Sequence, residues 1–361
     1  MNASESEEPK GRIIQPLRSE PTSEDADRRR DARDDLQEAL YEIKRVIVGQ
    51  DAMLERLLVS LLAGGHVLLE GVPGLAKTLT VKTLASVLGG SYSRIQFTPD
   101  LVPADLVGTR IFRPDKGSFE TELGPVFCNF LLADEINRAP AKVQSALLEV
   151  MQEQQVTLGG TTYRVPLPFV VMATQNPIES EGTYPLPEAQ LDRFLMKVIV
   201  DYPSAGEEAA VVGRSLAAQS VVRQCLSLDD LIRHSDAVET VLVDREVIGY
   251  AVALADATRR PSEHGLAELA PMIEFGASPR GPIGLVQAAR VLALLRGRGH
   301  ITGDDIRDLA ADVLRHRIVL SYDALSEGVT ADDVLGKVLA AVPAPEADRL
   351  IHSSTVPVRA S

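Results

Sequence analysis

A glycine-rich loop at residues 71–78 is the first place where residue types and spacing indicate chemistry. It reads Gly-Val-Pro-Gly-Leu-Ala-Lys-Thr, which fits the pattern Gly-x-x-Gly-x-x-Lys-Thr. Backbone N–H groups of such a loop, at the start of a helix, can cradle phosphate oxygens, while Lys77 adds a positive charge and Thr78 offers a hydroxyl to Mg²⁺. The usual loop has glycine where this chain has Ala76, and we expect alanine to cost little there if its φ is negative. A glycine turn that happens to precede Lys-Thr is the alternative.

Two acidic residues, Asp134 and Glu135, end the apolar run Phe130-Leu131-Leu132-Ala133. A carboxylate at the end of a buried strand beside a phosphate loop can hold the hydration shell of Mg²⁺, which is the role we expect for Asp134. Glu135 would then orient and deprotonate water. The alternative for Asp134 is a helix cap, a common use of aspartate. The nearby phosphate loop favours the catalytic interpretation.

Two other residues fit the same chemistry. Asn176 follows the apolar run 169–174, and its amide could position an attacking water, although Asn before Pro177 is also an ordinary turn signal. Arg280 follows Ser278 and Pro279, which are typical of a helix start, and a cation in the first helical turn is disfavoured by the helix dipole. We therefore expect an anion beside Arg280, either a nucleotide phosphate or a neighbouring carboxylate such as Glu274.

The elements that must position these residues form two domains. Near-continuous apolar runs, typical of strands that are covered on both faces, occur at 66–70, 128–133, 169–174 and 194–200. Helical spacing between them predicts an α/β domain with a doubly wound parallel sheet over residues 36–203. A smaller all-α domain is predicted over 204–361, from helical spacing at 206–219, 228–235, 244–259, 280–296, 302–316 and 330–341. Residues 1–35 are charged and poor in large apolar side chains, so we expect a disordered tail there.

Taken together, these motifs resemble the MoxR family of AAA+ ATPases, which is related to the ATPase subunit of magnesium chelatase. The resemblance covers residues 47–322 and rests on Val48-Gly49-Gln50, the phosphate loop, Ala-Asp-Glu-Ile-Asn-Arg, Ala-Thr-Gln-Asn-Pro, Leu-Asp-Arg-Phe and Ser-Pro-Arg-Gly, in the order of the family. It implies a P-loop NTPase core followed by an all-α lid. It also implies a Walker A motif at 71–78, a Walker B motif at 130–135, a sensor 1 at Asn176 and a sensor 2 at Arg280.

The resemblance further implies which residues contact the nucleotide. The expected set is Val48, Gly49, Gly71, Val72, Pro73, Gly74, Leu75, Ala76, Lys77, Thr78 and Leu79. Arg193 resembles the arginine finger that reaches the γ-phosphate of a neighbouring subunit in a ring, commonly a hexamer. A salt bridge of Arg193 with Asp192 or Glu188 is the alternative, and Arg138 is a second candidate for contact across the interface. Two segments, 107–126 and 155–165, are predicted to be hairpins that could touch a client.

The function expected from this resemblance is Mg²⁺-dependent ATP hydrolysis that moves the lid and remodels a protein client. MoxR relatives act as chaperones or insert metal cofactors, often with a partner that bears a von Willebrand factor A domain. A guanine-specific GTPase is not expected, because the tetrapeptide Asn-Lys-x-Asp is missing. Two alternatives stay open, a nucleic-acid motor and a nucleotide-binding scaffold with little turnover. The residues Glu135, Asn176, Arg193 and Arg280 argue against the scaffold.

Composition narrows the class of protein. The 361 residues are 45% hydrophobic and 24% charged, as in ordinary globular proteins. The net charge is −14, and the chain has 4% aromatic residues and no tryptophan, so nucleic-acid binding is not expected. Two cysteines, an acidic amino terminus and the lack of a long apolar run favour a cytoplasmic protein without disulfides or a membrane span.

Overall fold

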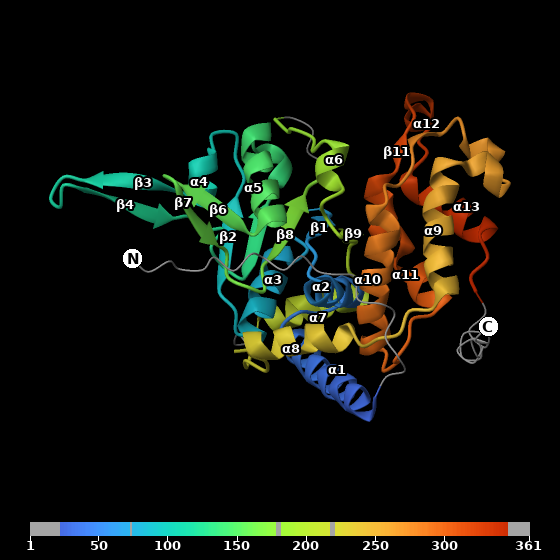
Figure 1. Cartoon of the computed structure of the whole chain (residues 1–361), viewed down its shortest axis with the longest axis horizontal. Helices are drawn as coiled ribbons and strands as arrows, with labels where there is room; N and C mark the ends of the chain where they lie inside the picture. The colour runs from blue at the N-terminus through green and yellow to red at the C-terminus, as the bar shows by residue number, and fades with distance from the viewer. Residues whose placement is uncertain (1–21, 73, 178–181, 217–220, 346–361) are drawn as a thin grey trace, which may run out of the picture.

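The computed structural model describes residues 22–72, 74–177, 182–216 and 221–345. An α/β domain carries two projecting hairpins on one side, and a helical domain lies against it on the other (Figure 1). Among the described residues, no helix is both long and apolar enough to cross a bilayer.

Five parallel strands form the central sheet in the order β2-β5-β8-β1-β9. The strands are β1 (Val67–Glu70), β2 (Tyr92–Gln96), β5 (Phe130–Asp134), β8 (Val170–Gln175) and β9 (Met196–Ile199). Four were predicted from their apolar runs. The edge strand β2 was not, because Ile95 is its one buried residue.

Both faces of the sheet are covered, as the apolar runs predicted. Side chains alternate along each strand, so Val67 and Leu69 join one hydrophobic core while Leu68 joins the other. The helices and turns of this domain are α2 (Asp51–Leu62), α3 (Lys77–Val87), α4 (Pro103–Val107), η1 (Ile136–Arg138), α5 (Ala141–Glu153) and α6 (Glu188–Leu191). A doubly wound sheet is therefore confirmed.

The two predicted hairpins are also present. They are the antiparallel pairs β3 (Gly108–Arg113) with β4 (Ser118–Leu123), and β6 (Gln155–Leu158) with β7 (Thr161–Arg164). They contact each other through Tyr163, whose hydroxyl donates to Thr121 Oγ1 at 3.2 Å. At the β3–β4 hairpin, Phe112 and Phe119 stay half exposed, with ring centroids 5.2 Å apart.

The amino-terminal region differs from the prediction of disorder through residue 35. Helix α1 runs over Ser23–Lys44, and Thr22 caps it with a capping box to Asp25. Ala32 and Leu36 are fully buried, so the helix is anchored well before residue 36. The charge of this segment lies on the exposed face of a helix, and that amphipathic pattern was missed. The remainder of the predicted tail, residues 1–21, lies outside the described residues.

The carboxyl-terminal half is mostly helical, with one departure from the all-α prediction. Its elements are α7 (Ala205–Ser215), α8 (Leu228–Val238), α9 (Arg245–Arg259), η2 (Pro261–His264), η3 (Ala267–Leu269), α10 (Arg280–Leu295), α11 (Gly303–Leu314), η4 (Arg315–Arg317), α12 (Tyr322–Ser326) and α13 (Ala331–Ala341). A short antiparallel pair, β10 (Ile273–Phe275) with β11 (Val319–Leu320), stands among them. In Figure 1, α7 and α8 lie beside α1 to α3, and α9 to α13 form the separate bundle.

Candidate active site

The phosphate loop leaves the carboxyl end of β1 and leads directly into α3. Lys77 begins the helix, and its Nζ donates to the carbonyl oxygen of Gly71 at 2.6 Å. Burial lowers the pKa of Lys77, while the charges of Asp134, Glu135 and Glu70 act in the opposite direction. The lysine therefore stands in the field of the acidic pair that the sequence predicted beside it. Pro73 lies outside the described residues.

Two site residues adopt the left-handed backbone conformation that favours glycine. Ala76 has φ +55°, so the condition under which alanine would cost little is not met. Its Cβ costs about 1 kcal/mol in this conformation. Glu135 has φ +56°. Such strain persists where the surrounding structure holds it in place, and it gathers at functional sites.

The carboxylate of Asp134 is held from two sides. Thr174 Oγ1 donates to Asp134 Oδ1 at 2.5 Å, and the guanidinium of Arg94 meets Asp134 Oδ2 at 2.7 Å. Thr174 comes from β8 and Arg94 from the edge strand β2. The Asp134 side chain is 14% exposed. A metal ion can therefore reach its carboxylate only at the small part that Thr174 and Arg94 do not cover.

Glu135 has its own set of partners. Its Oε2 accepts from Gln96 Nε2 at 2.9 Å and pairs with Arg138 Nε at 2.8 Å. Its backbone N–H donates to Thr174 Oγ1 at 2.8 Å. The Thr174 hydroxyl thus joins the two carboxylate residues, donating to one and accepting from the backbone of the other.

Asn176 and the segment of Val48 and Gly49 lie at the same carboxyl-terminal edge. Asn176 is buried and directly follows β8, and the carbonyl of Gln175 accepts from the Gly71 N–H at 3.3 Å. Next to Gly49, Gln50 Nε2 donates to the carbonyl of Asp201, just past the end of β9. The residues expected to hold a nucleotide are therefore brought together by the ends of β1, β5, β8 and β9.

Arg193 and Arg280 lie at the opposite, amino-terminal edge of the sheet. Arg193 comes before β9 begins, whereas Gly71 approaches Val200 after β9 ends. At about 3.3 Å per residue, the strand from Met196 to Val200 alone separates the two edges by about 13 Å. Arg280 Nη1 approaches the carbonyl of Asp192 at 3.5 Å, so it belongs to this edge too.

Among the described residues, Arg193 does not form the salt bridge with Asp192 or Glu188 that was its alternative role. Arg193 Nε donates to Gln152 Oε1 at 3.1 Å, at the end of α5, and its Nη1 donates to the carbonyl of Ala189. Asp192 instead pairs with Arg317. Arg193 is partly exposed to solvent, and Arg280 is exposed.

The carboxyl-terminal edge suits a magnesium nucleotide. The hydroxyl of Thr78 and the carboxylate of Asp134 offer oxygen ligands at this edge, and Mg²⁺ prefers oxygen ligands. Lys77 donates to the carbonyl oxygen of Gly71 and lies in the field of Asp134, Glu135 and Glu70, and its ammonium group suits contact with a phosphate at this loop. Open space surrounds Gly74, where an added Cβ would meet nothing within 4 Å.

Three contributors were missed from the sequence. Thr174 follows the apolar part of β8, and only the register of β5 against β8 brings it to Asp134. Arg94 and Gln96 alternate with the buried Ile95 on β2. That alternation was the available signal, but one buried side chain is too weak a pattern to identify a strand.

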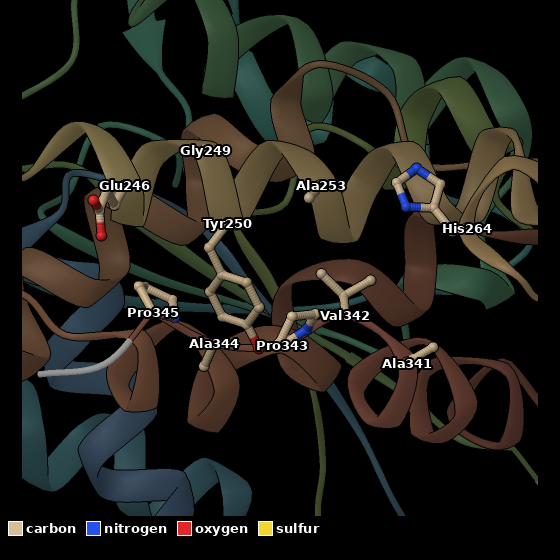
Figure 2. Close-up of a pocket in the computed structure, with 10 residues that line it drawn as sticks. All are labelled: Glu246, Gly249, Tyr250, Ala253, His264, Ala341, Val342, Pro343, Ala344 and Pro345. Atoms are coloured by element: carbon tan, nitrogen blue, oxygen red, sulfur yellow. The ribbon is translucent and has the colours of Figure 1, made fainter.

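A hollow of about 400 Å³ lies in the helical domain, away from these residues. It is formed by one side of α9, by His264 at the end of η2 and by the residues that end and follow α13, with Glu246 and Tyr250 facing Pro343 and Pro345 (Figure 2). None of its lining residues belongs to the predicted site. It does not bear on the phosphate chemistry.

Comparisons with known proteins agree with the two-domain layout. A model of the ATPase family associated with various cellular activities (AAA) matches residues 66–196, and a model of the AAA lid domain matches residues 267–338. The chaperone MoxR1 of Mycobacterium tuberculosis is 55% identical over 86% of this chain and 82% of its own length. The protein MoxR of Methylorubrum extorquens is 33% identical over 84% of this chain and 93% of its own length. A crystal structure from Cytophaga hutchinsonii, of a protein described as a candidate ATPase, superposes with a TM-score of 0.84 at 46% identity, covering 89% and 98% of the two chains.

Proposed function

Because this chain belongs to the MoxR family of AAA+ ATPases, we propose that it hydrolyses Mg²⁺-ATP in sites shared between neighbouring subunits of a ring. The observation that carries the proposal is the separation of the phosphate loop from Arg193 and Arg280 by the length of β9. One protomer cannot supply both halves to one nucleotide. A head-to-tail arrangement, in which the amino-terminal edge of one sheet faces the carboxyl-terminal edge of the next, supplies both.

Each residue then has a defined task. The loop N–H groups and Lys77 hold the phosphates, and Asp134 with Thr78 would hold the metal, which would neutralise negative charge on the phosphates. Glu135 accepts the proton of the attacking water as its oxygen bonds to the γ-phosphorus and the bond to ADP breaks. Asn176 orients that water. Arg193 and Arg280 of the neighbour compensate charge that develops on the transferred group.

The use of this hydrolysis is proposed from the family. A relative named as a chaperone is 55% identical, and the lid-type domain here is joined to the sheet at the arginine edge. We infer that hydrolysis shifts this domain, together with the sheet edge to which it is joined, against the neighbouring subunit and so remodels a protein client in the cytoplasm. A hexameric ring, a partner with a von Willebrand factor A domain and insertion of a metal cofactor stay predictions from the resemblance.

Subunit mixing tests the shared site. Glu135→Gln removes the base but keeps the arginines, and Arg193→Ala removes the finger but keeps the base. Each variant alone should lose at least 100-fold in ATP turnover, a loss typical of catalytic groups, while still binding a fluorescent ATP analogue. An equimolar mixture should regain activity at interfaces where an Arg193→Ala subunit supplies the phosphate loop with Glu135 and a Glu135→Gln subunit supplies Arg193. A mixture as inactive as its components would contradict the shared site.

A further inference from the structure

Asp192 joins the two arginines of the amino-terminal edge to the helical domain. Its carboxylate accepts a hydrogen bond from Ser278 Oγ at 2.8 Å and pairs with Arg317 Nε at 2.8 Å. Its carbonyl oxygen accepts from Arg280 Nη1 at 3.5 Å and from Arg317 Nη2 at 3.4 Å. One residue, the chain neighbour of Arg193, thus holds the turn before β9 to the start of α10 and to η4.

Arg317 makes this junction rigid. Its side chain is 3% exposed, and it also donates to the carbonyls of Phe194 at 2.7 Å and Leu195 at 3.1 Å. Burial lowers the pKa of Arg317, the charge of Asp192 opposes that shift, and the charge of Arg280 adds to it. A buried guanidinium without its carboxylate is strongly unfavourable. The turn that carries Arg193 and the helix that carries Arg280 therefore move together or not at all.

We propose that Asp192 is a positioning residue that sets the spacing of Arg193 and Arg280, so that both reach the same phosphate group of the neighbouring subunit. This inference rests on the proposed shared site. The Asp192 carboxylate is bonded to Ser278 and Arg317. It therefore does not neutralise Arg193, whose positive charge remains available to an anion from outside the subunit. Catalytic groups must hold their geometry to within about 0.5 Å. The two guanidinium groups therefore need a fixed spacing, and Asp192 is the residue that provides it.

A mixture with two defined roles separates positioning from general stability. Subunits with Glu135→Gln serve as arginine donors, and subunits with Arg193→Ala serve as loop donors. The productive pairs join a loop donor to an arginine donor. Asp192→Asn keeps the size of the side chain and an acceptor for Ser278, and it removes the charge that faces Arg317.

The expected result depends on which subunit carries the change. Asp192→Asn in the arginine donor should lower the recovered activity at least fivefold, mainly in kcat. The same change in the loop donor should leave the recovered activity as it was, because the arginines of that subunit take no part in productive pairs. A loss of equal size in both placements, or no loss in either, would overturn the proposal.

Two further variants keep the test clear of folding defects. Ser278→Ala removes only the hydroxyl that bonds Asp192 and the N–H of Arg280, and it should show the same dependence on placement with a smaller loss. Arg56→Gln is the matched control. It breaks another ion pair between the two domains, Arg56 with Asp312 at 2.8 Å, with side chains 12% and 15% exposed, and it should not depend on placement. If the reference mixture itself recovers no activity, the shared site is wrong and the role of Asp192 falls with it.

Discussion

At the scale of single residues, Asp134, the proposed magnesium ligand, has a cation beside it. Arg94 Nη2 lies 2.7 Å from Asp134 Oδ2, and Arg94 Nε lies 3.2 Å from the same oxygen. An arginine this close competes for a carboxylate that is proposed to hold Mg²⁺. The arginine side chain is 45% exposed, so solvent weakens the competition without removing it.

Replacing Arg94 should therefore change the magnesium requirement. We expect Arg94→Gln, in the Glu135→Gln background that blocks turnover, to lower severalfold the Mg²⁺ concentration needed for half-maximal binding of a fluorescent ATP analogue. The reason is that Asp134 keeps its full negative charge for the metal. Arg113→Gln, which breaks an exposed ion pair with Glu120 on the β3–β4 hairpin, is the control and should not change the Mg²⁺ dependence. An unchanged or higher requirement in Arg94→Gln would show that Arg94 does not compete.

The residues of the site differ in whether the neighbouring sequence indicates their role. The positions of Asp134 and Glu135 could be predicted because the pair ends an apolar strand, and that of Lys77 because its glycine-rich loop follows one, at the edge where parallel sheets bind ligands. Arg94, Gln96 and Thr174 could not, because their roles depend on which strands are neighbours and in what register. Nor could the positive φ of Ala76 be predicted from the residue type, since alanine rarely adopts it.

At the scale of elements, His66 ties three of them together just before β1. Its Nδ1 accepts from the Val171 N–H of β8 at 3.0 Å, which assigns the proton to Nε2, and Nε2 donates to the carbonyl of Met151 in α5 at 3.1 Å. Its ring also stands edge-on to Phe169 at 5.8 Å between centroids. Protonation would place a second N–H against that of Val171. Burial accordingly lowers the pKa of His66 to about 4.

This linkage predicts a loss of stability in mild acid. Between the ordinary pKa of 6.5 and about 4, the unfolded chain binds a proton at His66 that the folded protein does not. The free energy of unfolding should fall by about 2 kcal/mol on this account between pH 7 and pH 5. His66→Gln should lose this contribution in urea unfolding at the two pH values. A slope should remain from other groups, among them His316, whose pKa is also lowered by burial. Identical slopes in the two proteins would refute the assignment.

The elements themselves were largely predictable where periodicity is strong. The apolar runs gave four of the five sheet strands, and helical spacing gave the cores of α9, α10, α11 and α13. The prediction failed at α1, where charged residues dominate the composition and the buried face, Ala32 and Leu36, is narrow. It also failed at the β10–β11 pair, because two and three residues are too few to show alternation.

At the scale of the whole molecule, the two functional edges are set by the direction of the strands. Every strand of a parallel sheet ends at the same edge, so the phosphate loop, the acidic pair and Asn176 gather there. Arg193 precedes a strand and must lie at the other edge. This polarity could be inferred from the sequence order alone, but the position of Arg280 could not. It depends on how the helical domain docks, through Arg317 and Asp192, on the turn before β9.

With the proposed shared site, this polarity makes ATP turnover a property of the assembly. Specific ATP turnover should rise with protein concentration, following the mass measured by light scattering on the same samples with Mg²⁺-ATP, and it should fall toward zero where the protein is monomeric. The lid residue Arg280 should behave as Arg193 does, because both lie at the edge that faces away from the loop of their own subunit. Arg280→Ala subunits should therefore regain activity when mixed with Glu135→Gln subunits. A monomer that turns over ATP at full specific activity would place both arginines outside catalysis, since neither can span β9 to reach its own phosphates.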